Sequence, residues 1–156
     1  MRRKDRKLTT KEELLDILEN GKIVQIAFQD KNQPYIVTLN YGFYWTNENP
    51  VLYFHCANEG RKIECIKFNP EVCFSISICD PFVKGENACN YGMKYRSIVG
   101  YGKIRIVTDS EEKINGLNLI MKQYTGNNNW TYEDEMMNKT TVISLEVHEI
   151  TGKRKK

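Results

Sequence analysis

The stretch LYFHCANEGRKIECIKFNPEVCF, residues 52–74, determines most of the fold prediction. An alternating apolar run at its start is typical of a strand, which we place at 51–56. A polar turn follows, and apolar residues at helical spacing predict a short helix over 60–68, ended by Asn69-Pro70. Alternation resumes in 71–79 and predicts another strand. The stretch therefore predicts the order strand, helix, strand.

The start of this short helix is a candidate anion site. Free backbone N–H groups and the positive end of the helix dipole favour an anion at such a position. Arg61 and Lys62 add two adjacent cations that can make charge-assisted contacts with a phosphate. The alternative is an ordinary solvated helix start, and the residues alone leave both interpretations open.

Further elements flank this stretch on both sides. Predicted strands cover 23–29, 35–44, 94–107 and 141–150. Thr10 and Asp109, each followed by Glu three residues later, cap the two longer predicted helices, which cover about 10–20 and 109–124. Short connections between the first three strands predict an antiparallel meander. Gly100 and Gly102 interrupt a strand and indicate a bulge or a close backbone approach. The segment 80–92, which contains Pro and Gly, is a predicted long loop.

These elements define the predicted fold class as mainly β (α+β). The expected architecture is a six-stranded antiparallel split β-barrel with two longer helices and one short helix, in a single domain over 1–156. Six antiparallel strands in a chain of this size need closure or a covering layer to protect their edges, and a small barrel provides it.

The net charge of +3 is distributed unevenly along the chain. Five cations and Asp5 give residues 1–7 a charge of +4, four cations give 153–156 another +4, and the intervening residues therefore carry −5. A nucleic-acid-binding domain needs a basic stripe on a folded face, so we expect no nucleic-acid partner and interpret both segments as solvated basic tails.

Other composition features exclude further classes. The five cysteines contain no C-x-x-C pair and the chain has two histidines, so no metal site is predicted. The apolar runs are far shorter than the roughly 20 residues of a membrane-spanning helix, and no apolar segment follows the twin arginines Arg2 and Arg3. We therefore expect no membrane partner, no targeting segment and a cytoplasmic protein with reduced thiols.

Five segments in order resemble a known family: RRKDR near the start, PYIVTLNYGF (34–43), the stretch 52–74, YRSIVGYGKIRIV (95–107) and EVHEITGK (146–153). Together they are similar to the pyridoxamine 5′-phosphate oxidase-like FMN-binding split barrels, and within them to the nitroimidazole-resistance (Nim-type) branch. Each segment alone is weakly specific, whereas the ordered set covers nearly the whole chain. The resemblance implies FMN at the interface of a homodimer.

The resemblance also implies a set of cofactor-binding residues, which are Val37, Thr38, Leu39, Asn40, His55, Cys56, Arg61, Lys62, Tyr95 and Ser97. Backbone groups of 37–40 would lie along the flavin ring, and Arg61 and Lys62 would hold the 5′-phosphate. Nim-type sequences often have Pro in place of Thr38 and Ser in place of Cys56, so the resemblance assigns backbone contacts at these two positions.

Two side chains at the end of strand 51–56 allow more than one role. A lone histidine such as His55 is commonly structural, but the resemblance favours a catalytic residue that hydrogen-bonds the flavin or delivers a proton. Cys56 is interpreted as a small packed residue, the alternative being a thiol activated by nearby cations.

The resemblance implies an FMN-dependent oxidoreductase of the flavin reductase or nitroreductase type. No G-x-G-x-x-G fingerprint is present, so NAD(P)H is expected to bind transiently at the flavin before a small-molecule electron acceptor. The alternatives are a non-catalytic flavin or haem carrier, and an empty barrel that acts as a structural dimer.

Overall fold

The computed structural model describes residues 3–46 and 48–155. Arg2 and Lys156, which belong to the predicted basic tails, lie outside the described residues. The strands are β1 (Lys7–Leu8), β2 (Val24–Asp30), β3 (Gln33–Leu39), β4 (Gly42–Trp45), β5 (Pro50–Ala57), β6 (Glu71–Val83), β7 (Gly92–Ile106) and β8 (Thr140–Lys155). The helices are α1 (Lys11–Asn20), α2 (Arg61–Phe68), α3 (Ser110–Thr125) and α4 (Asp134–Lys139), with short 3-10 turns at Lys4–Arg6 and Ala88–Asn90.

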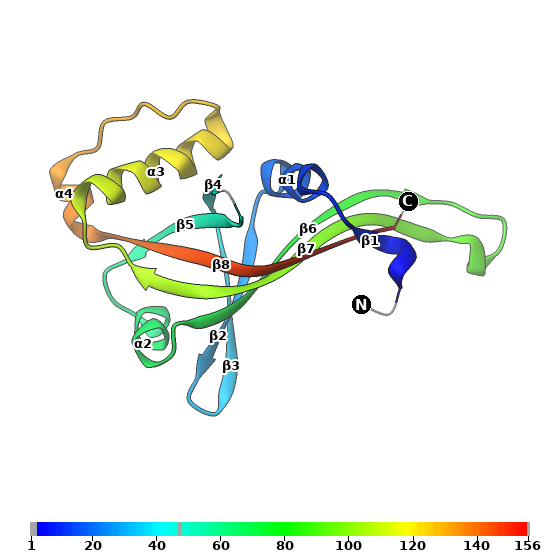
Figure 1. Ribbon diagram of the computed structural model, residues 1–156, viewed down its shortest axis with the longest axis horizontal. Helices are drawn as coiled ribbons and strands as arrows, with labels where there is room; N and C mark the ends of the chain where they lie inside the picture. Colours follow the sequence, from blue (N-terminus) through cyan, green and yellow to red (C-terminus); the bar gives the residue numbers. More distant parts are fainter. Residues whose placement is uncertain (1–2, 47, 156) are drawn as a thin grey trace.

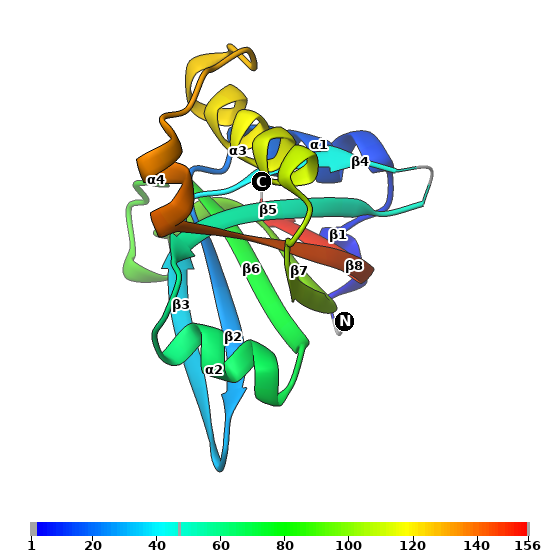
Figure 2. The same cartoon turned by 90° about the vertical axis from the view of Figure 1, so that its left-hand side faces the viewer.

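All strands belong to one antiparallel sheet in the order β3-β2-β6-β7-β8-β5-β4, with β1 paired to β8. The mainly β class is confirmed, but the sheet has eight strands within residues 3–46 and 48–155 rather than the six predicted. The two end strands, β3 and β4, are separated by only Asn40 and Tyr41, so the sheet must curl back on itself (Figures 1 and 2). In the described part of the chain β3 and β4 do not pair with each other, and the predicted barrel is therefore not closed.

The predicted strand 35–44 is wrong because Tyr41 divides it. The Tyr41 side chain is fully buried, and its hydroxyl donates a hydrogen bond to the Leu18 carbonyl at 2.7 Å. This corner sends the chain from β3, which pairs with β2, to β4, which pairs with β5. The two hairpins lie at opposite ends of the sheet order, so the predicted three-stranded meander is also wrong.

Two long strands replace the predicted loop 80–92. β6 continues to Val83 and β7 begins at Gly92, so only the hairpin tip between them is irregular. The β6–β7 hairpin extends beyond the body of the molecule, and both termini lie beside it (Figure 1). β8 likewise continues to Lys155, so residues 153–155 are part of a strand rather than a tail.

The helices begin at the residues that the sequence predicted. Thr10 forms a capping box with Glu13 at the start of α1, and the Asp109 carboxylate accepts the Glu112 N–H at 2.7 Å at the start of α3. The short helix α2 is confirmed, whereas α4 was missed. Helix α3 packs on β4 and β5, and the main core fills the curved sheet.

A bulge between Tyr101 and Gly102 shifts the pairing of β7 with β8 and confirms the reading of the glycines in this strand. A Cβ atom on Gly102 would lie 2.3 Å from the Glu146 carbonyl oxygen, a distance that only glycine avoids. The pairing passes over His148, so the extra residue of the bulge is in β8, at the base of the β6–β7 hairpin.

Candidate functional site

The predicted residues of β5 and α2 form one local group. Strand β5 ends just beyond His55 and Cys56, and a short turn leads to Gly60, which has a φ of 125° and caps α2. A side chain at this φ would be strained, so glycine permits the sharp entry into the helix. Arg61 and Lys62 are then the first two residues of α2, as predicted.

Arg61 is fixed by contacts within the chain. Its Nε donates to Asp30 Oδ2 at 2.6 Å, and its guanidinium lies 4.3 Å from the centroid of the Tyr35 ring. These contacts attach the start of α2 to the β2–β3 hairpin. Asp30 and Tyr35 were not predicted as part of the site, because their separation from Arg61 in sequence leaves no periodic signal.

Lys62 has a different environment from Arg61. Among residues 3–46 and 48–155 it forms no ion pair of the kind that holds Arg61 to Asp30. Burial first, and the charge of Lys62 second, lower the pKa of His55 below its ordinary value. Burial raises the pKa of Cys56, and Lys62 opposes this only in part. The imidazole and the thiol are therefore both uncharged near neutral pH, neither can form an ion pair with Lys62, and its ammonium group remains available to an anion.

The 37–40 segment borders the same core. Val37 and Leu39 are half-buried and pack against the cluster that contains Phe54 of β5 and Cys65 of α2. Thr38 and Asn40 are exposed, and Asn40 lies just beyond β3. As an end strand, β3 pairs only with β2 in the described part of the sheet. Alternate backbone N–H and C=O groups along its free edge can therefore hydrogen-bond a planar ligand, which fits the role expected for this segment.

Tyr95 and Ser97 lie at the other end of the sheet. Cys56 is opposite Thr141 at the start of β8, whereas Ser97 is opposite Lys153 near its end. The twelve-residue interval corresponds to roughly 40 Å along the strand at about 3.3 Å per residue. One FMN molecule does not span this separation, so a single chain does not bring all the predicted residues together.

Basic side chains surround Tyr95. Lys153 and Arg6 lower the pKa of the Tyr95 phenol, and Lys153 Nζ lies 5.7 Å from the ring centroid. Neither Arg6 nor Lys153 was predicted as part of a site, since both belong to segments that the sequence suggested were solvated tails. Only the charge count of these segments indicated that they were unusual.

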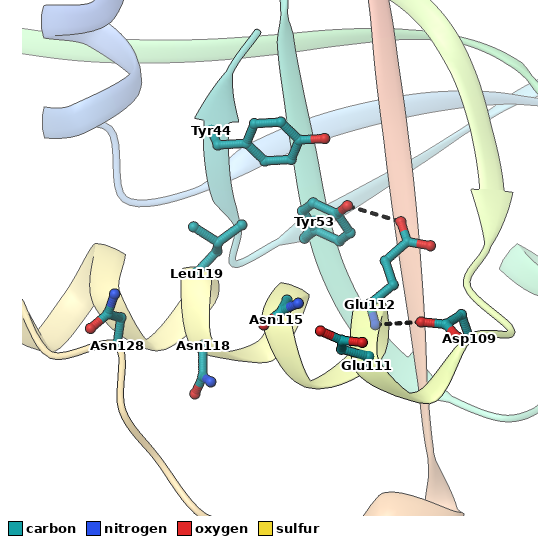
Figure 3. A pocket seen from close by; sticks show the side chains of 9 residues that line it. All are labelled: Tyr44, Tyr53, Asp109, Glu111, Glu112, Asn115, Asn118, Leu119 and Asn128. Atoms are coloured by element: carbon teal, nitrogen blue, oxygen red, sulfur yellow. Dashed lines mark hydrogen bonds between the residues drawn. The ribbon is translucent and has the colours of Figure 1, made fainter.

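A cavity of about 550 Å³ lies elsewhere, between α3 and the strands β4 and β5 (Figure 3). Tyr53 donates a hydrogen bond to Glu112 at its edge, at 2.9 Å. Asp109 and Glu111 also line the cavity, and none of the predicted cofactor residues does. Its carboxylates would repel a phosphate, so this cavity does not fit a flavin phosphate.

The described residues also bear on membrane proteins and metal-binding proteins as alternative classes. No helix combines the length and the apolar character needed to cross a membrane within 3–46 and 48–155. Over the same ranges, His, Cys, Asp and Glu side chains form no group of three or more that could hold a metal ion.

The comparisons with known proteins identify the family. Residues 10–154 match the model of the pyridoxamine 5′-phosphate oxidase family, and the chain therefore belongs to that family. No curated protein matches the sequence with significance. The chain is 30% identical to a candidate 5-nitroimidazole antibiotic resistance protein of Bacteroides thetaiotaomicron, with a TM-score of 0.82 over 95% of this chain and 86% of that one.

More distant solved structures share the fold. A flavocytochrome from Azotobacter vinelandii is 18% identical, with a TM-score of 0.81 over 100% of this chain and 72% of that one. An FAD- and haem-binding protein from Mycobacterium smegmatis is 16% identical, with a TM-score of 0.77 over 95% and 72%. The predicted family resemblance, including its nitroimidazole-resistance branch, is confirmed by the family match and by the relative from Bacteroides thetaiotaomicron.

Proposed function

We propose that this protein binds FMN at the interface of a homodimer and acts as an oxidoreductase of the flavin reductase or nitroreductase type. The observation that carries this proposal is Lys62 at the start of α2, beside His55 and Cys56, which has no ion-pair partner within residues 3–46 and 48–155. A cation at a helix N-terminus suits a phosphate monoester, and the free edge of β3 suits a flavin ring.

Each residue of the candidate site has a distinct role in the proposed function. Lys62 and the first N–H groups of α2 hold the phosphate, and Arg61, through Asp30 and Tyr35, keeps the helix in position. Backbone groups of 37–40 orient the ring. His55 is neutral near pH 7 because its pKa is lowered, so it accepts or donates one hydrogen bond and does not carry a charge. When bound, FMN supplies electron transfer between a reduced nicotinamide and a small-molecule acceptor.

The division of the predicted site residues between two regions supports the proposal of a homodimer. Tyr95 and Ser97 on β7 pair with the end of β8, whereas His55 and Cys56 on β5 pair with its start, so the two pairs lie too far apart to reach the same flavin in one chain. A two-fold dimer would bring these residues of one protomer to the flavin held by α2 of its partner. We propose this arrangement, with the β6–β7 hairpin as the element that reaches across.

A non-catalytic flavin or haem carrier is the second candidate. The lowered pKa of His55 and the raised pKa of Cys56 favour it, because neither group is an effective proton donor near neutral pH. A relative of the same fold, moreover, is described as binding both FAD and haem.

Two measurements test the proposal and separate the candidates. FMN is titrated into the purified protein and its fluorescence followed, with saturable quenching expected and no uptake contradicting the proposal. NADH or NADPH is then added without oxygen. Bleaching of the flavin absorbance supports an oxidoreductase, whereas bound flavin that stays oxidised supports a carrier.

A further inference from the structure

The two basic ends of the chain lie side by side at one end of the sheet. β1 pairs with β8, with Lys7 opposite Lys153 and Leu8 opposite Gly152. Figure 1 shows both termini near the β6–β7 hairpin. Residues 3–8 and 153–155 together carry seven Lys and Arg side chains and one carboxylate. Folding thus brings the two basic segments together, and their charges create one local positive field.

A concave site lies between these segments. It has a volume of about 360 Å³ and is lined by Arg3, Asp5, Arg6, Lys7, Arg154 and Lys155, which we call the terminal basic pocket. Its single carboxylate, Asp5, is bound by Arg3 through two hydrogen bonds of 2.9 and 2.7 Å. That contact keeps the pKa of Asp5 at about 2.

The remaining cations of the pocket are less fully paired. Arg154 contacts Glu13 at 3.0 Å, and Arg6 lies 3.9 Å from Asp5. Lys7 and Lys155 form no ion pair among residues 3–46 and 48–155, unlike Arg3 and Arg154. Two ammonium groups and a guanidinium edge are therefore available to an incoming anion.

Tyr95 adds a neutral donor next to the pocket. Arg6, which lines the pocket, also interacts with the Tyr95 phenol, as Lys153 does from β8. A phenol held between two cations can donate its hydrogen to a phosphate oxygen. Cations and a hydroxyl donor around one concavity are the groups that phosphate recognition requires.

We propose that the terminal basic pocket binds a small ligand with two neighbouring phosphate groups, such as a diphosphate. A concave site of this size suits a small anion, whereas nucleic acid needs a basic stripe over a broad face. The rest of the chain, residues 8–152, has a net charge of −5 and would repel a long polyanion. This site is separate from the proposed FMN phosphate site at Lys62 and does not depend on it.

Calorimetric titration of the full chain with inorganic pyrophosphate tests the proposal. Saturable binding is expected, with ADP binding more tightly than AMP if a nucleotide is the source of the phosphates. Lys7→Gln and Lys155→Gln should each weaken pyrophosphate binding by about tenfold. Lys4→Gln is the matched control, because it removes the same charge from the same segment outside the pocket.

Three outcomes would overturn the proposal. The first is equal weakening by Lys4→Gln, which would mean that binding follows net charge rather than the pocket. The second is tighter binding of a single-stranded oligonucleotide than of pyrophosphate. The third is loss of pyrophosphate binding in Lys62→Ala, which would place the anion at α2. The melting temperature of each variant is measured as a control, because an unchanged value shows that a loss of affinity does not come from loss of folding.

Discussion

The start of α2 and the outer end of the β6–β7 hairpin carry the two parts of the proposed flavin site, and they are organised differently. At α2, residues close in sequence meet locally: His55 and Cys56 precede Arg61 and Lys62 by a few residues. At the hairpin, by contrast, Tyr95 meets residues from both ends of the chain. The first region is readable from local spacing, whereas the second exists only through long-range strand pairing.

The hairpin offers the largest expected effect, since its base depends on one glycine. Gly102→Val should lower the free energy of unfolding by about 3 kcal/mol, because the new Cβ would meet the Glu146 carbonyl, which strand pairing fixes. Urea denaturation measures this. Tyr101→Val, at the exposed neighbouring position, should stay within about 0.5 kcal/mol of wild type. Equal effects of the two changes would show that the bulge is not required.

The α2 region offers an effect on affinity. Lys62→Ala should weaken FMN binding by about 1.5–3 kcal/mol through loss of a charge-assisted phosphate contact. Lys67→Ala is the matched control, since Lys67 is on the same helix and is paired with Glu64 at 3.0 Å. Fluorescence titration measures both. An unchanged affinity of Lys62→Ala would leave this helix start as an ordinary solvated one.

Arg61 separates positioning from binding within the same region. Arg61→Ala should cost about 1 kcal/mol of stability, because a half-exposed ion pair and a cation–π contact are lost. Its effect on FMN affinity should be smaller than that of Lys62→Ala. Asp30→Asn should reproduce the part of this loss that comes from the ion pair. A larger loss of affinity for Arg61→Ala than for Lys62→Ala would reverse the roles assigned here.

His55 provides the smallest effect. Its pKa is lower in the folded chain than the ordinary value near 6.5, so the unfolded chain binds the proton more readily as the pH falls. Stability should therefore decline slightly from about pH 7.5 to about pH 5.5, and His55→Gln should decline less. Thermal unfolding of both proteins at the two pH values tests this. An identical decline in stability for wild type and His55→Gln would show that His55 is not the source of the pH dependence.

The sequence predicted those features that depend on neighbouring residues. The caps Thr10 and Asp109, the helix α2 and the bulge beside Gly102 are all indicated by local signals, and the structure confirms them. The division of 35–44 was not predictable in this way, because the buried hydroxyl of Tyr41 finds its partner in α1. The same reason applies to the extended β6–β7 hairpin, since its long strands are stabilised by β8.

Prediction of the candidate site from the sequence is limited in the same way. Spacing identified Lys62 beside His55, but it did not reveal that Arg61 is already held by Asp30. It also treated the ends of the chain as solvated, although Lys7 pairs with Lys153 in the sheet. Charge counts along a sequence show how much charge is present, and only the pairing of strands shows where that charge gathers.

The central claim, that two protomers complete one flavin site, is tested most directly by mixing two defective variants. Lys62→Ala removes the α2 part, and a Tyr95→Ala/Ser97→Ala double variant removes the hairpin part. Each is expected to bind little FMN alone at a limiting FMN concentration. After denaturation and refolding together in equal amounts, half of the dimers are mixed and each contains one intact site, so roughly a quarter of the wild-type FMN capacity should return. No recovery in demonstrably mixed dimers, or full binding by a wild-type monomer, would contradict the shared site.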